Sequence, residues 1–180
     1  MSRERAARQA ASARRVVLGF LARCLAYWGA ALFAVSRLPS IEAFGIDATV
    51  KSVQALFSLL GMPVERHESA LFVAGTSVEI VSDCSPHMPY LMFAAVVLAF
   101  PTTWKRRLLG LLLGAVLIHL FNTLRIMALI GVLAWRRPWF EFVHVYLFQT
   151  GTVVVVFVTF AVWLRTIATR PPPRTGPGTA

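Results

Sequence analysis

Residues 108–134 read LLGLLLGAVLIHLFNTLRIMALIGVLA, and this stretch decides the class of fold. Its ionisable side chains are His119 and Arg125. An α-helix rises about 1.5 Å per residue, so the stretch is long enough to cross the roughly 30 Å hydrocarbon core of a bilayer. We therefore predict a transmembrane helix that holds one permanent positive charge.

Three further apolar stretches, at about 16–36, 86–104 and 144–165, predict three further spans. The 180-residue chain is 57% hydrophobic and 14% charged, a balance that suits helices in lipid rather than a soluble domain. Arg23 lies inside the first stretch but near its basic end, where a long side chain can reach the headgroups. The expected fold is an all-α polytopic membrane protein with about four transmembrane helices.

Residues 37–87 form the largest segment outside these spans. Apolar residues recur there at helical spacing among polar ones, which predicts an amphipathic helix lying on the membrane or the bundle: Val50, Val53, Leu56, Phe57 and Leu60. The sequence Gly61-Met62-Pro63 would end this helix. Residues 70–74 and 77–81 then predict a short β-hairpin around Gly75-Thr76.

The net charge of +10 comes from basic residues placed before the first span, between the second and third, and after the fourth. Such clusters mark cytoplasmic segments, so both ends of the chain are expected inside and the 37–87 segment outside. The predicted location is the cytoplasmic (inner) membrane. Nucleic acid is not an expected partner.

Three regions are expected on this basis: a basic cytoplasmic tail at 1–15, a membrane-embedded domain at 16–169, and a disordered Pro/Gly-rich cytoplasmic tail at 170–180. The first apolar stretch is too long for a secretory signal, and it is expected to remain as an uncleaved helix.

Three reactive side chains are predicted at one depth, near the outer face. Counting from the basic ends of their spans, Cys84 is roughly 30 Å from Trp104, Arg125 roughly 27 Å from Arg107, and His144 roughly 32 Å from Arg165. A thiol, a guanidinium and an imidazole from three different spans would therefore meet at the outer face of the membrane.

Together these groups predict cysteine-dependent acyl transfer. A thiolate forms more readily beside a cation and attacks amide carbonyls. His144 could carry a proton to the leaving amine, and Arg125 could donate to the developing oxyanion. Asn122 lies three positions before Arg125 on the same helix face, where it could orient the guanidinium or bond a neighbouring helix. No cofactor or metal is predicted.

At these residues the sequence resembles the exosortase/archaeosortase family of membrane transpeptidases, especially its small single-module exosortases. The matching pieces stand in the same order as in the family: Asp83-Cys84-Ser85, Asn122-Thr123-Leu124-Arg125-Ile126, and residues 144–151 (HVYLFQTG). The resemblance implies that Cys84 is the nucleophile, Arg125 the oxyanion stabiliser and His144 the general acid/base.

The resemblance also implies the partners. The substrates would be exported proteins with a C-terminal sorting signal, which consists of a short motif, a transmembrane helix and a basic tail. The enzyme would work in membrane lipid, cleave near the outer face and form a thioester, which passes to a lipid, glycan or water acceptor. Many members have Gly two positions after the cysteine, where this chain has Pro86, which has no backbone N–H to offer an oxyanion.

Other interpretations remain open from the sequence. The chain could be a non-enzymatic scaffold of an envelope polysaccharide or protein export system, with Arg125 as a structural hydrogen-bond hub. A metal or haem site would have to use His87, His119 and His144, which lack close ligand spacing. His87 rivals His144 as the catalytic base, and Glu141 could orient His144. Cys24 is expected too far from Cys84 in depth for a disulfide.

Overall fold

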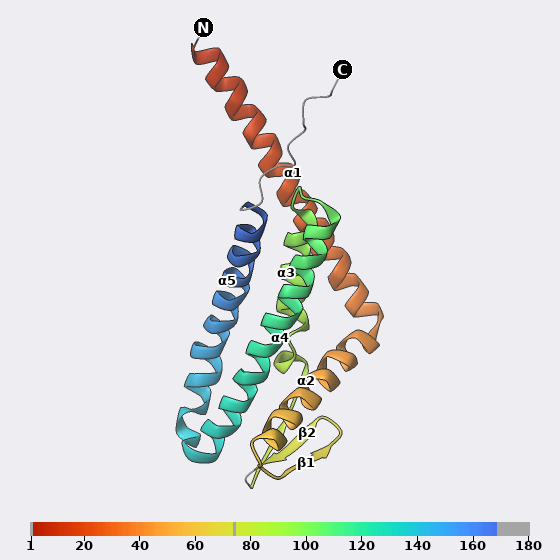
Figure 1. The fold of residues 1–180 in the computed structure, drawn as a ribbon, viewed down its shortest axis with the longest axis vertical. Coiled ribbons are helices and arrows are strands. Elements are labelled where there is room, and N and C mark those ends of the chain that lie inside the picture. Colours follow the sequence, from red (N-terminus) through yellow and green to blue (C-terminus); the bar gives the residue numbers. More distant parts are fainter. Residues whose placement is uncertain (1, 74, 169–180) are drawn as a thin grey trace, which may run out of the picture.

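The computed structural model describes residues 2–73 and 75–168, and most of them are helical (Figure 1). The helices are α1 (Ser2–Arg37), α2 (Pro39–Leu59), α3 (His87–Ala99), α4 (Trp104–Trp135) and α5 (Gln149–Ala168). Short helical turns complete the order: η1 (Ser82–Cys84), η2 (Arg137–Trp139) and the π-helix η3 (Phe142–Phe148). The predicted disordered tail at 170–180 lies outside the described residues.

The predicted class, an all-α polytopic membrane protein, is confirmed. Within the described residues, three helical stretches are long and apolar enough to cross a membrane: Ala11–Arg37, Trp104–Trp135 and Phe142–Ile167. The first of these belongs to α1, which begins at Ser2, so the predicted basic tail continues the same helix as the first span.

The predicted second span, 86–104, is shorter than expected. Helix α3 ends at Ala99, and its 13 residues rise only about 20 Å, less than the hydrocarbon core. Phe100 turns to an extended conformation (ψ 135°) because Pro101 disfavours the helical conformation in the residue before it. Thr103, also extended, leads directly into α4.

Figure 1 shows that the elements gather at two ends of the molecule. At the basic end, the α3–α4 connection lies near the end of α5, and α4 starts there with Lys105, Arg106 and Arg107. At the opposite end, which we call the sheet end, lie the β-strands and the turn from α4 into η3. The first half of α1 extends beyond the bundle at the basic end.

Helices α3, α4 and α5 approach closely at glycines of α4. The Trp163 indole packs against Gly110, where an added Cβ would lie 2.6 Å from Nε1, and the indole N–H donates to the Arg106 carbonyl at 2.9 Å. Gly114 leaves room for the ring of Phe93. Small residues let membrane helices pack tightly, and here they bury an apolar cluster: Phe93, Val97, Ile118 and Trp163.

At the sheet end, α2 and a small sheet cover one face of α4. Strands β1 (Val64–His67), β2 (Ala70–Val73) and β3 (Thr76–Glu79) are antiparallel in that order. The β2–β3 pair confirms the predicted hairpin, whereas β1 was not predicted because its sequence VERH is polar. The predicted amphipathic helix is part of α2, which already begins at Pro39.

The sheet and α2 share one apolar core with α4. We call it the sheet-end cluster, and its buried members are Val50, Val53, Phe57, Leu71, Val73, Ile80, Ile126 and Ile130. At the edge of this cluster, a salt bridge joins β1 to α2. Arg66 contacts the Asp47 carboxylate at 2.7 Å, and Lys51 contacts the same carboxylate at 2.8 Å. This side of α4 is therefore closely packed.

Candidate active site

Cys84 ends the η1 turn just ahead of α3. Its N–H donates to the Val81 carbonyl at 2.9 Å, and the Ser85 N–H donates to the Ser82 carbonyl at 2.9 Å. Pro86 caps α3 and accepts a hydrogen bond from the Tyr90 N–H at 3.0 Å. Pro86 thus begins the helix, in a position where the missing N–H leaves no intrahelical bond unmade.

Helix α4 holds the cysteine segment through Asn122. The buried Asn122 side chain donates to the Cys84 carbonyl at 2.8 Å. This contact places Cys84 level with Asn122, about 4.5 Å nearer the basic end than Arg125.

Arg125 and His144 line one cavity of about 530 Å³, which we call the Arg125–His144 cavity. The residues on either side of the cysteine, Asp83 and Ser85, line it as well. The remaining walls come from α1, α3 and α5: Trp28, Met88, Pro89, Met92, Gln149, Thr152 and Val153, with Ser82 of η1. The cavity thus joins two predicted site residues with the segment that carries the third.

The Cys84 side chain does not line this cavity and packs, partly buried, against the sheet-end cluster. It is nevertheless near enough to Arg125 for their charges to interact. Cys84 and Cys24 are both free thiols.

Arg125 is half-buried in the middle of an apolar helix. Its Nε is buried, and among the described residues no group accepts a hydrogen bond from it. A buried cation without a carboxylate partner is costly to a membrane protein and marks a functional position. The Asn122 amide, considered as a group that could orient Arg125, holds the Cys84 carbonyl instead.

His144 lies in η3, where its ring stacks at a tilt on Phe140 with centroids 5.4 Å apart. Glu141 was considered as its orienting partner, yet no hydrogen bond joins the two within the part of the chain that the structure describes. The ring is held by an aromatic neighbour and keeps its place in the cavity wall.

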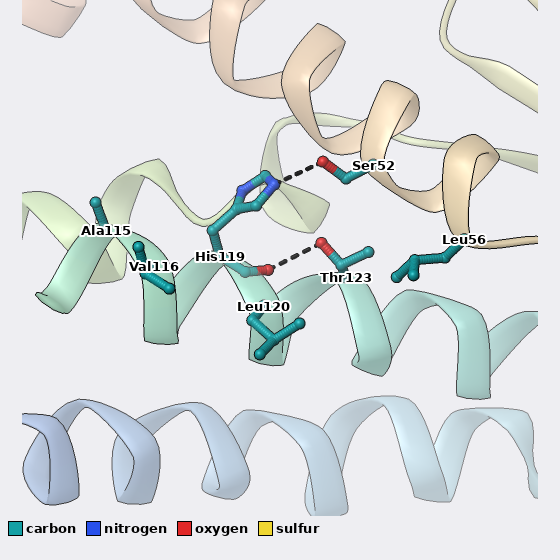
Figure 2. A pocket seen from close by; sticks show the side chains of 7 residues that line it. All are labelled: Ser52, Leu56, Ala115, Val116, His119, Leu120 and Thr123. Carbon is teal, nitrogen blue, oxygen red and sulfur yellow. Dashed lines mark hydrogen bonds between the residues drawn. The ribbon is translucent and has the colours of Figure 1, made fainter. Parts of the chain in front are cut away.

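The rival histidines point elsewhere. His119 shares a 2.8 Å hydrogen bond with Ser52 of α2, while the Thr123 hydroxyl donates to the His119 carbonyl at 2.9 Å (Figure 2). His119 and His87 line a separate cavity of about 370 Å³ between α2, α3 and α4. Among residues 2–73 and 75–168, no three His, Cys, Asp or Glu side chains gather as a metal ion would need. The hydrogen bond between His119 and Ser52 thus joins α4 to α2.

The sequence interpretation missed several residues of the cavity wall. Trp28 comes from the first span, and Gln149 and Thr152 follow His144 by five and eight positions. The polar run Gln149-Thr150-Gly151-Thr152 at the start of an apolar span was a usable signal for the latter pair. Nothing in the sequence pairs Trp28 with residues so distant along the chain.

Comparison with known proteins gives one match. The family model described as transmembrane exosortase (Exosortase_EpsH) matches residues 10–164. Neither the curated proteins nor the solved structures contain a significant match to the chain.

Proposed function

The chain belongs to the transmembrane exosortase family, and from this membership we propose that it is a cysteine-dependent membrane transpeptidase. Family membership supports the transpeptidase-like role in general. The finer proposal is that the chain cleaves the C-terminal sorting signals of exported proteins near the outer face of the inner membrane, with the sheet end outside. Cleavage would leave the substrate's transmembrane helix behind.

The first half of the reaction forms a thioester. The Cys84 thiolate attacks the carbonyl carbon of the scissile peptide bond, and the oxyanion that develops accepts hydrogen bonds from Arg125. The C–N bond then breaks, and the leaving amine takes a proton from His144. Because Pro86 has no N–H, more of the oxyanion stabilisation falls on the guanidinium.

The second half releases the product. An acceptor O–H or N–H, from a lipid, a glycan or water, gives its proton to His144 and attacks the thioester carbonyl. The C–S bond breaks and the thiolate is restored. The substrate leaves with a new C-terminal bond to the acceptor.

One observation carries this proposal: Arg125 and His144 line the same cavity as both neighbours of Cys84. Asn122 supports it as a positioning residue, because its hydrogen bond to the Cys84 carbonyl fixes the backbone of the proposed nucleophile. A cation beside a thiol favours the thiolate, and Arg125 is the cation proposed for this role.

The test follows a tagged substrate with a C-terminal sorting signal in cells that produce the enzyme. Wild type is expected to shorten the substrate, and Cys84→Ala and Cys84→Ser are expected to abolish shortening at unchanged enzyme level. Cys24→Ala is the matched control, because it removes the only other thiol and should keep full activity. Processing by Cys84→Ala would overturn the proposal.

Two further measurements define the intermediate and the acceptor. Hydroxylamine intercepts thioesters, so it should yield a substrate that ends in a hydroxamate, and Cys84→Ala should yield none. Mass spectrometry of the uninhibited product identifies the acceptor by the mass added to the new C-terminus. A hydroxamate that forms equally with Cys84→Ala would rule out the Cys84 thioester.

A further inference from the structure

We infer that an apolar groove between α3 and α5, flanked by α1 near the site, is the docking place for the substrate's transmembrane helix. This inference rests on the proposed function and adds where the substrate lies and which residues hold it. It concerns side chains that take no part in the chemistry.

The groove is continuous with the Arg125–His144 cavity. A second cavity, of about 270 Å³, lies between α3 and α5, and Met92 and Val153 line both cavities. Its other walls are apolar: Phe93, Val96, Val156, Phe157 and Phe160. A ligand seated in the groove would therefore reach the site without crossing other protein.

The direction of the groove follows from the spacing of its residues. Met88, Met92 and Val96 stand one turn apart on α3, and Val153 and Phe157 stand one turn apart on α5. Both helices begin at the candidate site and run toward the basic end (Figure 1). The wall on α3 is thus about 12 Å long and runs into the membrane, as a substrate helix would.

The chemistry of the walls selects a helix rather than a polar ligand. The 270 Å³ cavity is lined by Met, Phe and Val side chains alone, none of which donates a conventional hydrogen bond. A transmembrane helix satisfies its own backbone groups and needs only packing. A substrate helix lying here would place the peptide just outside its apolar end at Arg125 and His144.

The helices that frame the groove lack partners on this side. In the most apolar window of each span, 6% of the residues are buried in Phe142–Ile167 and none in Ala11–Arg37, whereas 33% are buried in Trp104–Trp135. Phe157 and Val153 are 70% and 63% exposed. Trp28 of α1 is already at the wall of the Arg125–His144 cavity, where it would flank the substrate.

Cross-linking tests the contact directly. Phe157→Cys is introduced into a Cys24→Ala, Cys84→Ala enzyme, which should hold the substrate uncleaved, and single cysteines are placed along the substrate helix. Oxidation is expected to link Phe157→Cys to substrate positions that repeat every three to four residues. Leu112→Cys on α4 is the matched control, since Leu112 is 58% exposed and lies outside the groove. Equal linking at both positions would overturn the inference.

A kinetic variant provides the second arm. Met92→Trp narrows the groove where it meets the cavity and is expected to lower kcat/KM by at least about tenfold, mostly through KM, whereas Leu112→Trp should process normally. Normal processing by Met92→Trp, while Cys84→Ala remains inactive, would overturn the groove and leave the enzyme proposal standing. Absence of processing by wild type would overturn the enzyme proposal itself. A photoreactive side chain placed in the groove that cross-links to lipid alone, with substrate present, would show that lipid occupies the groove. That result would overturn the inference.

Discussion

Two regions of the bundle, the side of α4 that faces α2 and the groove between α3 and α5, differ in how tightly they are covered. On the side facing α2 and the sheet, Val50 and Val53 are fully buried and the Asn122 amide holds the Cys84 carbonyl at 2.8 Å. On the other side of the bundle, between α3 and α5, Val153 and Phe157 of α5 remain largely exposed. Under the proposed function, the packed side would hold the backbone of Cys84 and the open groove would admit the substrate.

The polar contacts follow the same division. Helix α2 is joined to α4 by the Ser52–His119 hydrogen bond and to β1 by the Asp47–Arg66 salt bridge. Near the site, α5 instead meets α4 by close approach of Gly151 to Phe121. The Trp163–Arg106 hydrogen bond that joins α5 to α4 lies at the basic end, so the part of α5 near the site is freer to adjust to a guest helix than the hydrogen-bonded α2 side is.

The largest effect is expected from a substitution of Arg125. Arg125→Lys keeps the charge and loses the planar fork, so the oxyanion loses its best donor. We expect kcat to fall by about 100-fold or more, as when an oxyanion donor is removed. Single-turnover processing of a tagged substrate measures it, and Arg137→Lys, at an exposed position in η2, should change nothing. Wild-type rates with lysine would reduce Arg125 to a structural charge.

The next effect tests the packed side through Asn122. Asn122→Leu removes the bond to the Cys84 carbonyl and leaves that oxygen unpaired, at a cost of about 1–3 kcal/mol in the free energy of unfolding. As a positioning residue it should lower kcat about tenfold and leave KM unchanged. Thr123→Val is the matched control, because the buried Thr123 hydroxyl bonds only within its own helix. Equal kcat in both variants would contradict the positioning role.

A pair of glycines compares the two sides by stability. A Cβ on Gly45 of α2 would lie 2.6 Å from the Ser85 hydroxyl, and one on Gly151 of α5 would lie 3.0 Å from the Phe121 ring edge. We expect Gly45→Ala to be destabilising by about 1–3 kcal/mol, as overpacking usually is, and Gly151→Ala to cost less because α5 can shift. Thermal unfolding in detergent measures both. Gly131→Ala, with open space around it, is the control. A larger loss of stability in Gly151→Ala than in Gly45→Ala would contradict the comparison.

The smallest effect is expected from a substitution of Asp47, at the edge of the sheet-end cluster. Hydrogen bonds from Lys51 and then Arg66 lower the pKa of Asp47 below its usual value. A lowered carboxylate pKa contributes stability above the unfolded pKa and loses it as the pH falls through the folded pKa. Asp47→Asn should therefore lower Tm slightly at pH 7, and the difference should vanish in acid. A difference that persists below the folded pKa would show that the contact does not depend on charge.

The sequence by itself determined the class of fold and named two residues, Arg125 and His144, that line one cavity. Hydropathy is a local property, so residues 108–134 predicted a membrane helix, and counting residues from its basic end brought Arg125 to the depth of His144. The three motifs around Cys84, Arg125 and His144 also indicated the family before any comparison was made. The span and its depth needed only the helical rise and the cost of charge in lipid, whereas the family needed the resemblance of the motifs.

The tertiary structure decided what depends on contacts between distant segments. It turned Asn122 to the Cys84 carbonyl, placed Trp28 in the cavity wall and directed the Cys84 side chain toward the sheet-end cluster. It also added strand β1, whose polar sequence gave no sign of its pairing with β2. Spacing along a chain fixes depth in the membrane, but only packing fixes which helices are neighbours and which face each presents.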